Sequence, residues 1–111
     1  MAKANPIKAI ESQAKKFADV TAGESCNQKS FKVGKVAFLY LGPGAKGVGF
    51  KAMFKLKASM LEAKQLAKDS PKEFEIGNTG WVTSRFTDEK PLPKALWQKW
   101  LKESYDVATG Q

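Results

Sequence analysis

The chain has 111 residues, enough for one domain over residues 1–111 with its own hydrophobic core and too few for two. Its formal net charge of +8 favours a polyanionic partner, although surplus lysine also keeps proteins soluble. It contains no histidine and a single cysteine, Cys26, which excludes a zinc site and removes the usual general base, so we expect no enzyme, no metal and no cofactor.

The expected location follows from the cysteine content and the apolar runs. Cys26 has no second cysteine to pair with, which is typical of a reducing compartment. The first residues lack the continuous apolar stretch of a secretory signal, and no run approaches the roughly 18 apolar residues of a membrane span. We therefore expect a soluble cytoplasmic protein that does not bind a membrane, and a monomer in preference to an oligomer.

The first predicted element in chain order is a helix over residues 6–19. Asn5 and Pro6 suit the N-cap and the first helical position, and apolar residues then recur on one face. The small, polar segment 21–27 follows, and we interpret it as a connection of ordinary length.

Three strands are predicted next. Residues 31–33 and 36–40 form β-rich runs on either side of Gly34, which indicates a tight hairpin or a bulge. Residues 48–57 alternate with period two, so the larger apolar side chains share one face and the three lysines occupy the other. Burial stabilises apolar side chains and penalises unpaired ammonium groups, so we expect the apolar face to point into the core.

The second half of the chain is predicted to contain a helix over residues 58–68, a hairpin of strands 73–76 and 81–86, and a terminal helix from Leu92. Strong helix formers followed by a Ser-Pro stop indicate the first helix, and a glycine-bounded turn separates the two strands. The fold class is therefore predicted as α+β. We expect two layers, with an antiparallel five-stranded sheet, the N- and C-terminal helices on one of its faces, and the element order α-β-β-β-α-β-β-α.

Gly42, Gly44 and Gly47 match the G-x-G-x-x-G spacing of dinucleotide-binding loops. That motif needs a helix directly after the glycines, whose N–H groups face the phosphate, whereas a strand is predicted here. A Walker loop fails as well, because Val48 stands where its lysine is required. We therefore predict a Pro/Gly hairpin connection.

The segment 46–53 partly matches the RNA-recognition signature but lacks two of its three aromatic positions. The signature also requires an exposed Phe50 for base stacking, whereas the alternation places this ring with the buried side chains. We therefore interpret the match as accidental.

The three tryptophans are interpreted as core residues. Trp97 and Trp100 lie one turn apart on an amphipathic helix. Trp81, beside a glycine turn, either caps the core or offers an exposed stacking surface, and we favour the core.

Several strings and the order of elements resemble the MmcQ/YjbR-like family. The strings are FKVGKVAF at 31–38, the lysine-bearing strand 51–57, DSP at 69–71, GWV at 80–82 and ESY at 103–105. The resemblance covers residues 6 to 108 and implies a CyaY-like, frataxin-related α+β fold. DNA binding through a double-wing surface has been proposed for this family. Iron binding, known for frataxin relatives, is not expected, because the first helix offers only Glu11 and Asp19 among its lysines.

The predicted function is a small binding module that contacts nucleic acid, DNA in the first place, without sequence specificity. All but one of its 19 basic residues are lysines, whereas arginine makes most bidentate base contacts. The predicted contacts are Lys51, Lys55 and Lys57 on one strand face, Lys35 and Lys46 near the hairpins, and Arg85 on a neighbouring strand. One alternative is a regulatory or interaction module that binds an acidic protein, and another is a small-ligand binder or enzyme with a cleft between the sheet and the terminal helix.

Overall fold

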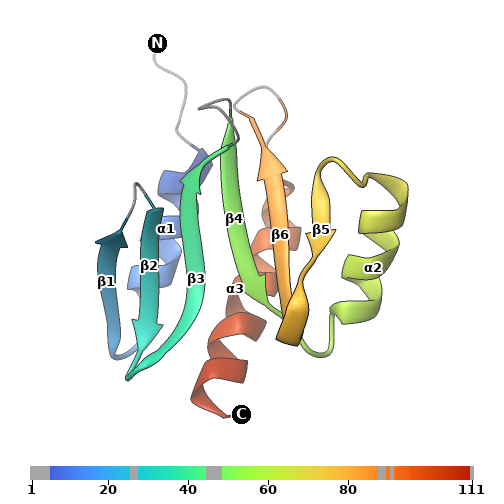
Figure 1. Ribbon diagram of the computed structural model, residues 1–111. Helices are drawn as coiled ribbons and strands as arrows, with labels where there is room; N and C mark the ends of the chain where they lie inside the picture. Colours follow the sequence, from blue (N-terminus) through green and yellow to red (C-terminus); the bar gives the residue numbers. More distant parts are fainter. Residues whose placement is uncertain (1–5, 26–27, 45–48, 88–89, 91, 111) are drawn as a thin grey trace.

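The computed structural model of the chain describes residues 6–25, 28–44, 49–87, 90 and 92–110. Within these residues the chain forms a six-stranded antiparallel sheet of strand order β1-β2-β3-β4-β6-β5 (Figure 1). The strands are β1 (Val20–Ser25), β2 (Gln28–Val33), β3 (Val36–Pro43), β4 (Phe50–Lys55), β5 (Phe74–Ile76) and β6 (Trp81–Phe86). Asn5, Cys26, Lys46, Gly47 and Val48, which entered the sequence predictions, lie outside the described residues.

Three helices complete the fold: α1 (Pro6–Lys15), α2 (Met60–Asp69) and α3 (Lys94–Thr109). α1 and α3 lie on the same face of the sheet, and α2 packs beside the edge strand β5 (Figure 1). A short 3-10 turn, η2 (Asn78–Gly80), connects β5 to β6. The predicted two-layer α+β class with both terminal helices on one face is confirmed.

The predicted strand count of five is wrong, because the segment interpreted as a connection is strand β1. It pairs with β2 along its whole length, from Val20 opposite Val33 to Ser25 opposite Gln28. The preceding helix correspondingly ends at Lys15 and not at residue 19. Hydrogen bonds of the 3-10 type tighten its last turn, and Asp19, with a φ of 62°, then redirects the chain into the strand.

Strand β4 has the two faces that the sequence predicts. Ala52 and Phe54 are fully buried under the helices, and Leu56 continues the pattern just beyond the strand. Lys51 and Lys55 alternate with them and point to the opposite face, which no described helix covers. We call this second surface the open face.

The core lies between the sheet and the helices α1 and α3. Trp100 is fully buried and packs edge-on against Phe54 and Phe74, with ring centroids 5.9 and 5.8 Å away. Trp97 is also buried, as predicted. Tyr105 stacks on Phe17 at 4.6 Å and ties the terminal helix to the chain after α1.

A β-bulge in β3 shapes the centre of the sheet. Phe31 pairs with Leu39 and Lys32 pairs with Ala37, so Phe38 between them has no partner on β2. The hydroxyl of Ser104 in α3 donates to the Phe38 carbonyl and accepts the Lys55 backbone N–H at 2.9 Å. This buried serine therefore satisfies two backbone groups of β3 and β4 and ties α3 to both strands.

Glu103 holds the start of α2 against α3. Its carboxylate accepts the backbone N–H groups of Lys57 and Ser59, at 2.7 and 2.9 Å, and the Ser59 hydroxyl at 2.7 Å. Burial alone would raise the pKa of Glu103, but these hydrogen bonds to the charged form outweigh it, and the pKa is lowered from its ordinary value.

Glu103→Gln should lower the free energy of unfolding by about 1.5–3 kcal/mol at pH 7, since charge-assisted hydrogen bonds are lost. Because the folded-state pKa is depressed, this stabilisation is present above the unfolded pKa and is lost as pH falls through the folded one. Urea unfolding at pH 7 and pH 3 should therefore show a difference between variant and wild type that shrinks in acid. Glu75→Gln, at a mostly exposed carboxylate, is the control, and an equal difference at both pH values would contradict the assignment.

Candidate nucleic-acid interface

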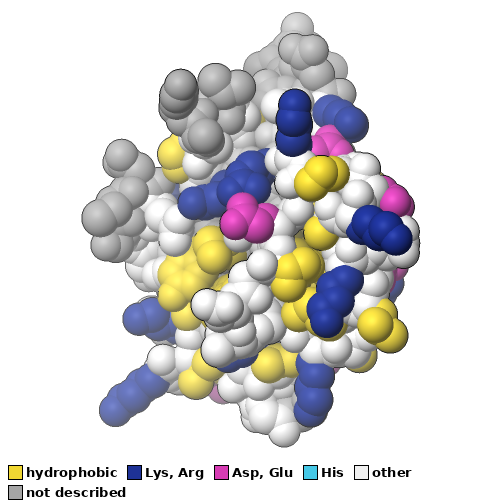
Figure 2. All heavy atoms as spheres, turned by 45° about the vertical axis from the view of Figure 1, so that its right-hand side comes forward, with side chains coloured by type: hydrophobic (Ala, Val, Ile, Leu, Met, Phe, Trp, Pro, Cys, Tyr) yellow, Lys and Arg dark blue, Asp and Glu magenta, His cyan; other side chains and the backbone are white. Residues whose placement is uncertain are grey.

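Basic side chains from two adjacent strands meet on the open face. Lys51 of β4 lies directly opposite Arg85 of β6, and Lys55 lies opposite Trp81. Among the described residues neither lysine forms an ion pair. The positive charges of Lys51 and Arg85 therefore lie side by side, and Glu75 is the carboxylate that pairs with Arg85. Figure 2 shows Lys and Arg side chains grouped on the surface, with an acidic side chain between them and a hydrophobic patch.

Arg85 carries the one ion pair that the described part of the open face contains. Its guanidinium donates to Glu75 of β5 at 2.8 Å, and both side chains are more than one third exposed. An ion pair as exposed as this contributes little free energy, about 1 kcal/mol or less. A phosphate can therefore compete for the guanidinium.

Aromatic side chains form the hydrophobic part of the open face. Tyr40 of β3 and Trp81 of β6 meet across β4, with ring centroids 5.3 Å apart and planes inclined by 53°. Met53 lies opposite Tyr40 on the intervening strand, and the Lys55 Nζ lies 6.0 Å from the Trp81 ring centroid. Neither ring belongs to the core cluster, and both are partly exposed. We name Tyr40, Met53 and Trp81 the aromatic patch.

The favoured interpretation of Trp81 as a core residue is therefore wrong. In the strand W-V-T-S-R-F, Val82, Ser84 and Phe86 are buried under the helices, so the alternation places Trp81 with Thr83 and Arg85 on the open face. Phe50, the ring of the RNA-recognition signature, lies on the helical side instead and packs against Phe86 at 5.9 Å.

The other predicted contacts lie around this surface or outside the described chain. Lys35 is exposed in the β2–β3 turn, and Lys57 is exposed just after β4, at the same end of the sheet (Figure 1). Lys46 is not among the described residues. Lys51, Lys55 and Arg85 are thus the predicted residues that the structure brings together, with Lys35 and Lys57 at the margin.

Sequence reasoning overlooked Tyr40 and Lys32. Leu39 and Leu41 are buried, so Tyr40 between them points to the open face, and Lys32 alternates in the same way with buried Phe31. Strict period-two reading of β2 from Phe31 locates Lys32, whereas Tyr40 follows the bulge at Phe38, where strict alternation fails.

The glycine-rich segment is a hairpin connection, as predicted. Strand β4 begins at Phe50, directly after the glycines, where a dinucleotide loop would need a helix. Gly44 donates its N–H to the Gly49 carbonyl at 3.0 Å. Gly49 has a φ of 71°, and a Cβ there would lie 2.6 Å from the Phe86 carbonyl oxygen, so glycine is required for this close approach to β6.

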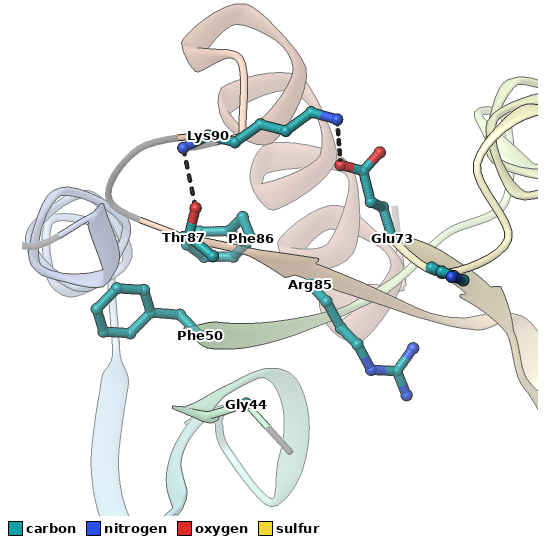
Figure 3. Close-up of a pocket in the computed structure, with 8 residues that line it drawn as sticks. Gly44, Phe50, Glu73, Arg85, Phe86, Thr87 and Lys90 are labelled. Carbon is teal, nitrogen blue, oxygen red and sulfur yellow. Dashed lines mark hydrogen bonds and ion pairs between the residues drawn. The ribbon is translucent and has the colours of Figure 1, made fainter. Parts of the chain in front are cut away.

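A cavity of about 330 Å³ lies beside this connection (Figure 3). Lys90 and Glu73 in its wall form an ion pair at 2.9 Å, and the Lys90 backbone N–H donates to the Thr87 hydroxyl. The hydrogen bond from the Lys90 ammonium lowers the pKa of Glu73 from its ordinary value. Arg85 points away from this ion pair (Figure 3). The small-ligand or enzyme alternative stays a prediction.

The part of the chain that the structure describes holds neither a candidate metal site nor a candidate membrane span. No group of three or more His, Cys, Asp or Glu side chains there is placed to hold a metal ion. None of the described helices has the length and apolar character needed to cross a membrane.

Comparison with known proteins identifies the fold. No protein-family model matches the sequence, and no curated protein matches it either. The crystal structure of Deinococcus radiodurans protein DR2400, described as a DUF419 domain, superposes with a TM-score of 0.72. The match covers 99% of this chain and 84% of that chain at 15% sequence identity. Likeness at this identity establishes a shared fold, and the resemblance to the MmcQ/YjbR-like family stays a prediction.

Proposed function

We propose that this protein binds nucleic acid, with the open face as the contact surface and phosphates as the main binding groups. The observation that carries the proposal is the juxtaposition of Lys51 with Arg85 on neighbouring strands of a sheet face that no described helix covers. A pair of adjacent cations with one weakly held carboxylate nearby is stabilised by an anion that lies between them.

The arrangement favours binding without sequence preference. Lys51 and Lys55 lie on one strand at a separation of about 13 Å, given a rise of about 3.3 Å per residue, so a nucleic-acid backbone can follow β4. Lysine contacts phosphates as a point charge, whereas base reading in the major groove depends on bidentate partners such as arginine. Lys35 and Lys57 extend the positive surface at one end of the sheet.

The double variant Lys51→Glu/Lys55→Glu tests the proposal against mixed-sequence DNA. Wild type should bind at low salt with a dissociation constant of about 10⁻⁶–10⁻⁴ M or tighter, followed by fluorescence anisotropy, and log K should fall linearly with log salt. The variant should bind at least about tenfold more weakly. The slope of log K against log salt should also become shallower by about 2, because two phosphate contacts are lost.

Lys8→Glu/Lys94→Glu is the matched control, because it changes the net charge equally. Both lysines are exposed in the first turns of α1 and α3, on the opposite side of the sheet, where a carboxylate also suits the helix dipole. No binding by wild type up to about 100 μM protein in low salt, or an equal loss in both variants, would refute the proposal. Equal affinity for polyglutamate and DNA would instead favour an acidic protein as partner.

A further inference from the structure

We infer that the open face accepts a single strand of nucleic acid, whose bases stack on Tyr40 and Trp81 while its phosphates contact Lys51, Lys55 and Arg85. This inference rests on the proposed function and names the form of nucleic acid that the site takes. It is supported by the aromatic patch, because phosphate binding by the basic residues gives these rings no role.

The aromatic patch does not belong to the hydrophobic core. The helices cover the other face of the sheet, and the core cluster contains neither ring. The two rings come from β3 and β6 and meet over β4, so they form one apolar surface across three strands. Three partly exposed apolar side chains that adjoin on a sheet face without a covering helix form a candidate binding surface.

The neighbours of the two rings specify a charged, ring-containing ligand. Lys55 lies over Trp81, and Lys51 lies four residues away on the same strand, opposite Arg85. Cations next to exposed aromatic rings are the combination that single-strand-binding surfaces use, since every base presents a π-face and every nucleotide a phosphate. Bases inside a duplex are stacked on each other, so flat rings on a sheet face are useful only to unpaired bases.

Lys55 does not block the stacking surface. An exposed cation–π contact contributes about a 2- to 5-fold preference, whereas base stacking on an aromatic side chain contributes about 5- to 150-fold per base. A base can therefore displace the ammonium group from Trp81, and the freed Lys55 then pairs with a phosphate. Stacking also explains why little sequence preference is expected.

The experiment compares a dT12 oligonucleotide with an abasic strand of the same length and with duplex DNA, by anisotropy at low salt. Wild type should bind dT12 more tightly than the abasic strand. Tyr40→Leu/Trp81→Leu should weaken dT12 binding by about 5-fold or more and leave the abasic strand and the duplex unaffected. Tyr40→Phe/Trp81→Phe keeps both rings and should retain most of the preference for dT12.

The outcomes separate this inference from the proposed function. If dT12, abasic strand and duplex bind equally and the leucine variant changes nothing, the stacking site is refuted while phosphate binding stands. If none of the three binds, both are refuted. A leucine variant that loses all three ligands equally would also overturn the stacking role, and thermal unfolding shows whether that variant is folded. Replacing dT12 with rU12 then tells whether DNA or RNA is preferred.

Discussion

Trp100→Ala should lower the free energy of unfolding by about 3–5 kcal/mol, the largest loss that we expect from a single substitution in this chain. The side chain is fully buried and packs edge-on against Phe54 of β4 and Phe74 of β5. Its indole N–H also donates to Glu62 of α2 at 3.1 Å. One ring thus connects the terminal helix to two strands and to the second helix, and its removal leaves a cavity among all of them.

Urea unfolding followed by far-UV circular dichroism measures this loss. Trp100→Phe keeps much of the packing and removes the hydrogen bond, so a smaller loss of about 1–2 kcal/mol is expected. Leu61→Ala is the matched control, because Leu61 is 80% exposed on α2 and its truncation should change stability by less than about 0.5 kcal/mol. A loss below about 1 kcal/mol for Trp100→Ala would contradict the central role given to this ring.

Ser104→Ala should lower the free energy of unfolding by about 2–4 kcal/mol, although it removes a single oxygen atom. The hydroxyl donates to the Phe38 carbonyl at the bulge and accepts the Lys55 N–H. Both backbone groups lose this partner in the variant. An unsatisfied buried polar group costs about 1–3 kcal/mol, so two of them account for the expected range.

The amide of Lys55 gives a local readout for this variant. Its hydrogen exchange, measured by NMR, should speed up more than that of amides in β6, because the Lys55 N–H loses its acceptor. Thr109→Ala on the same helix is the control: its hydroxyl donates to the Asp106 carbonyl one turn earlier, near the end of α3, and the expected loss is below about 1 kcal/mol. Equal stability losses for the two variants would show that Ser104 has no special part in the sheet.

The position of Lys55 connects this structural serine to the candidate site. The same residue donates its backbone N–H to Ser104 on the helical side and extends its side chain over Trp81 on the open face. Loosening this point should therefore also weaken single-strand binding in Ser104→Ala, to a smaller extent than direct removal of the rings.

The elements that the sequence predicted well are those specified by local patterns. β6 has the predicted bounds, 81–86, and the alternation of β4 is confirmed over Phe50–Lys55. β1 was missed because V-T-A-G-E-S has no clear apolar alternation, and it becomes a strand through backbone pairing with β2. Backbone pairing satisfies the N–H and C=O groups whatever the side chains are, so the residue types of this segment do not predict it.

The bulge in β3 illustrates a second limit. Simple alternation in V-A-F-L-Y puts Val36, Phe38 and Tyr40 on one face. With one extra residue at Phe38, the strand buries Phe38 together with Leu39 and Leu41, and Tyr40 points to the open face. The bulge carbonyl is held by Ser104 of α3, which lies 66 residues from Phe38 in the sequence, and the bulge turns Tyr40 to the open face.

The sequence by itself determined that β4 has an apolar face and a lysine-bearing face, because alternation is a property of one strand in water. Which side chains share the open face was decided only by the tertiary structure. β6 follows β5 in the chain but lies between β4 and β5 in the sheet, which sets Arg85 opposite Lys51 and brings Trp81 to Tyr40. Strand order depends on how the sheet packs against α1 and α3, and this sum of many weak contacts has no local signature in the sequence.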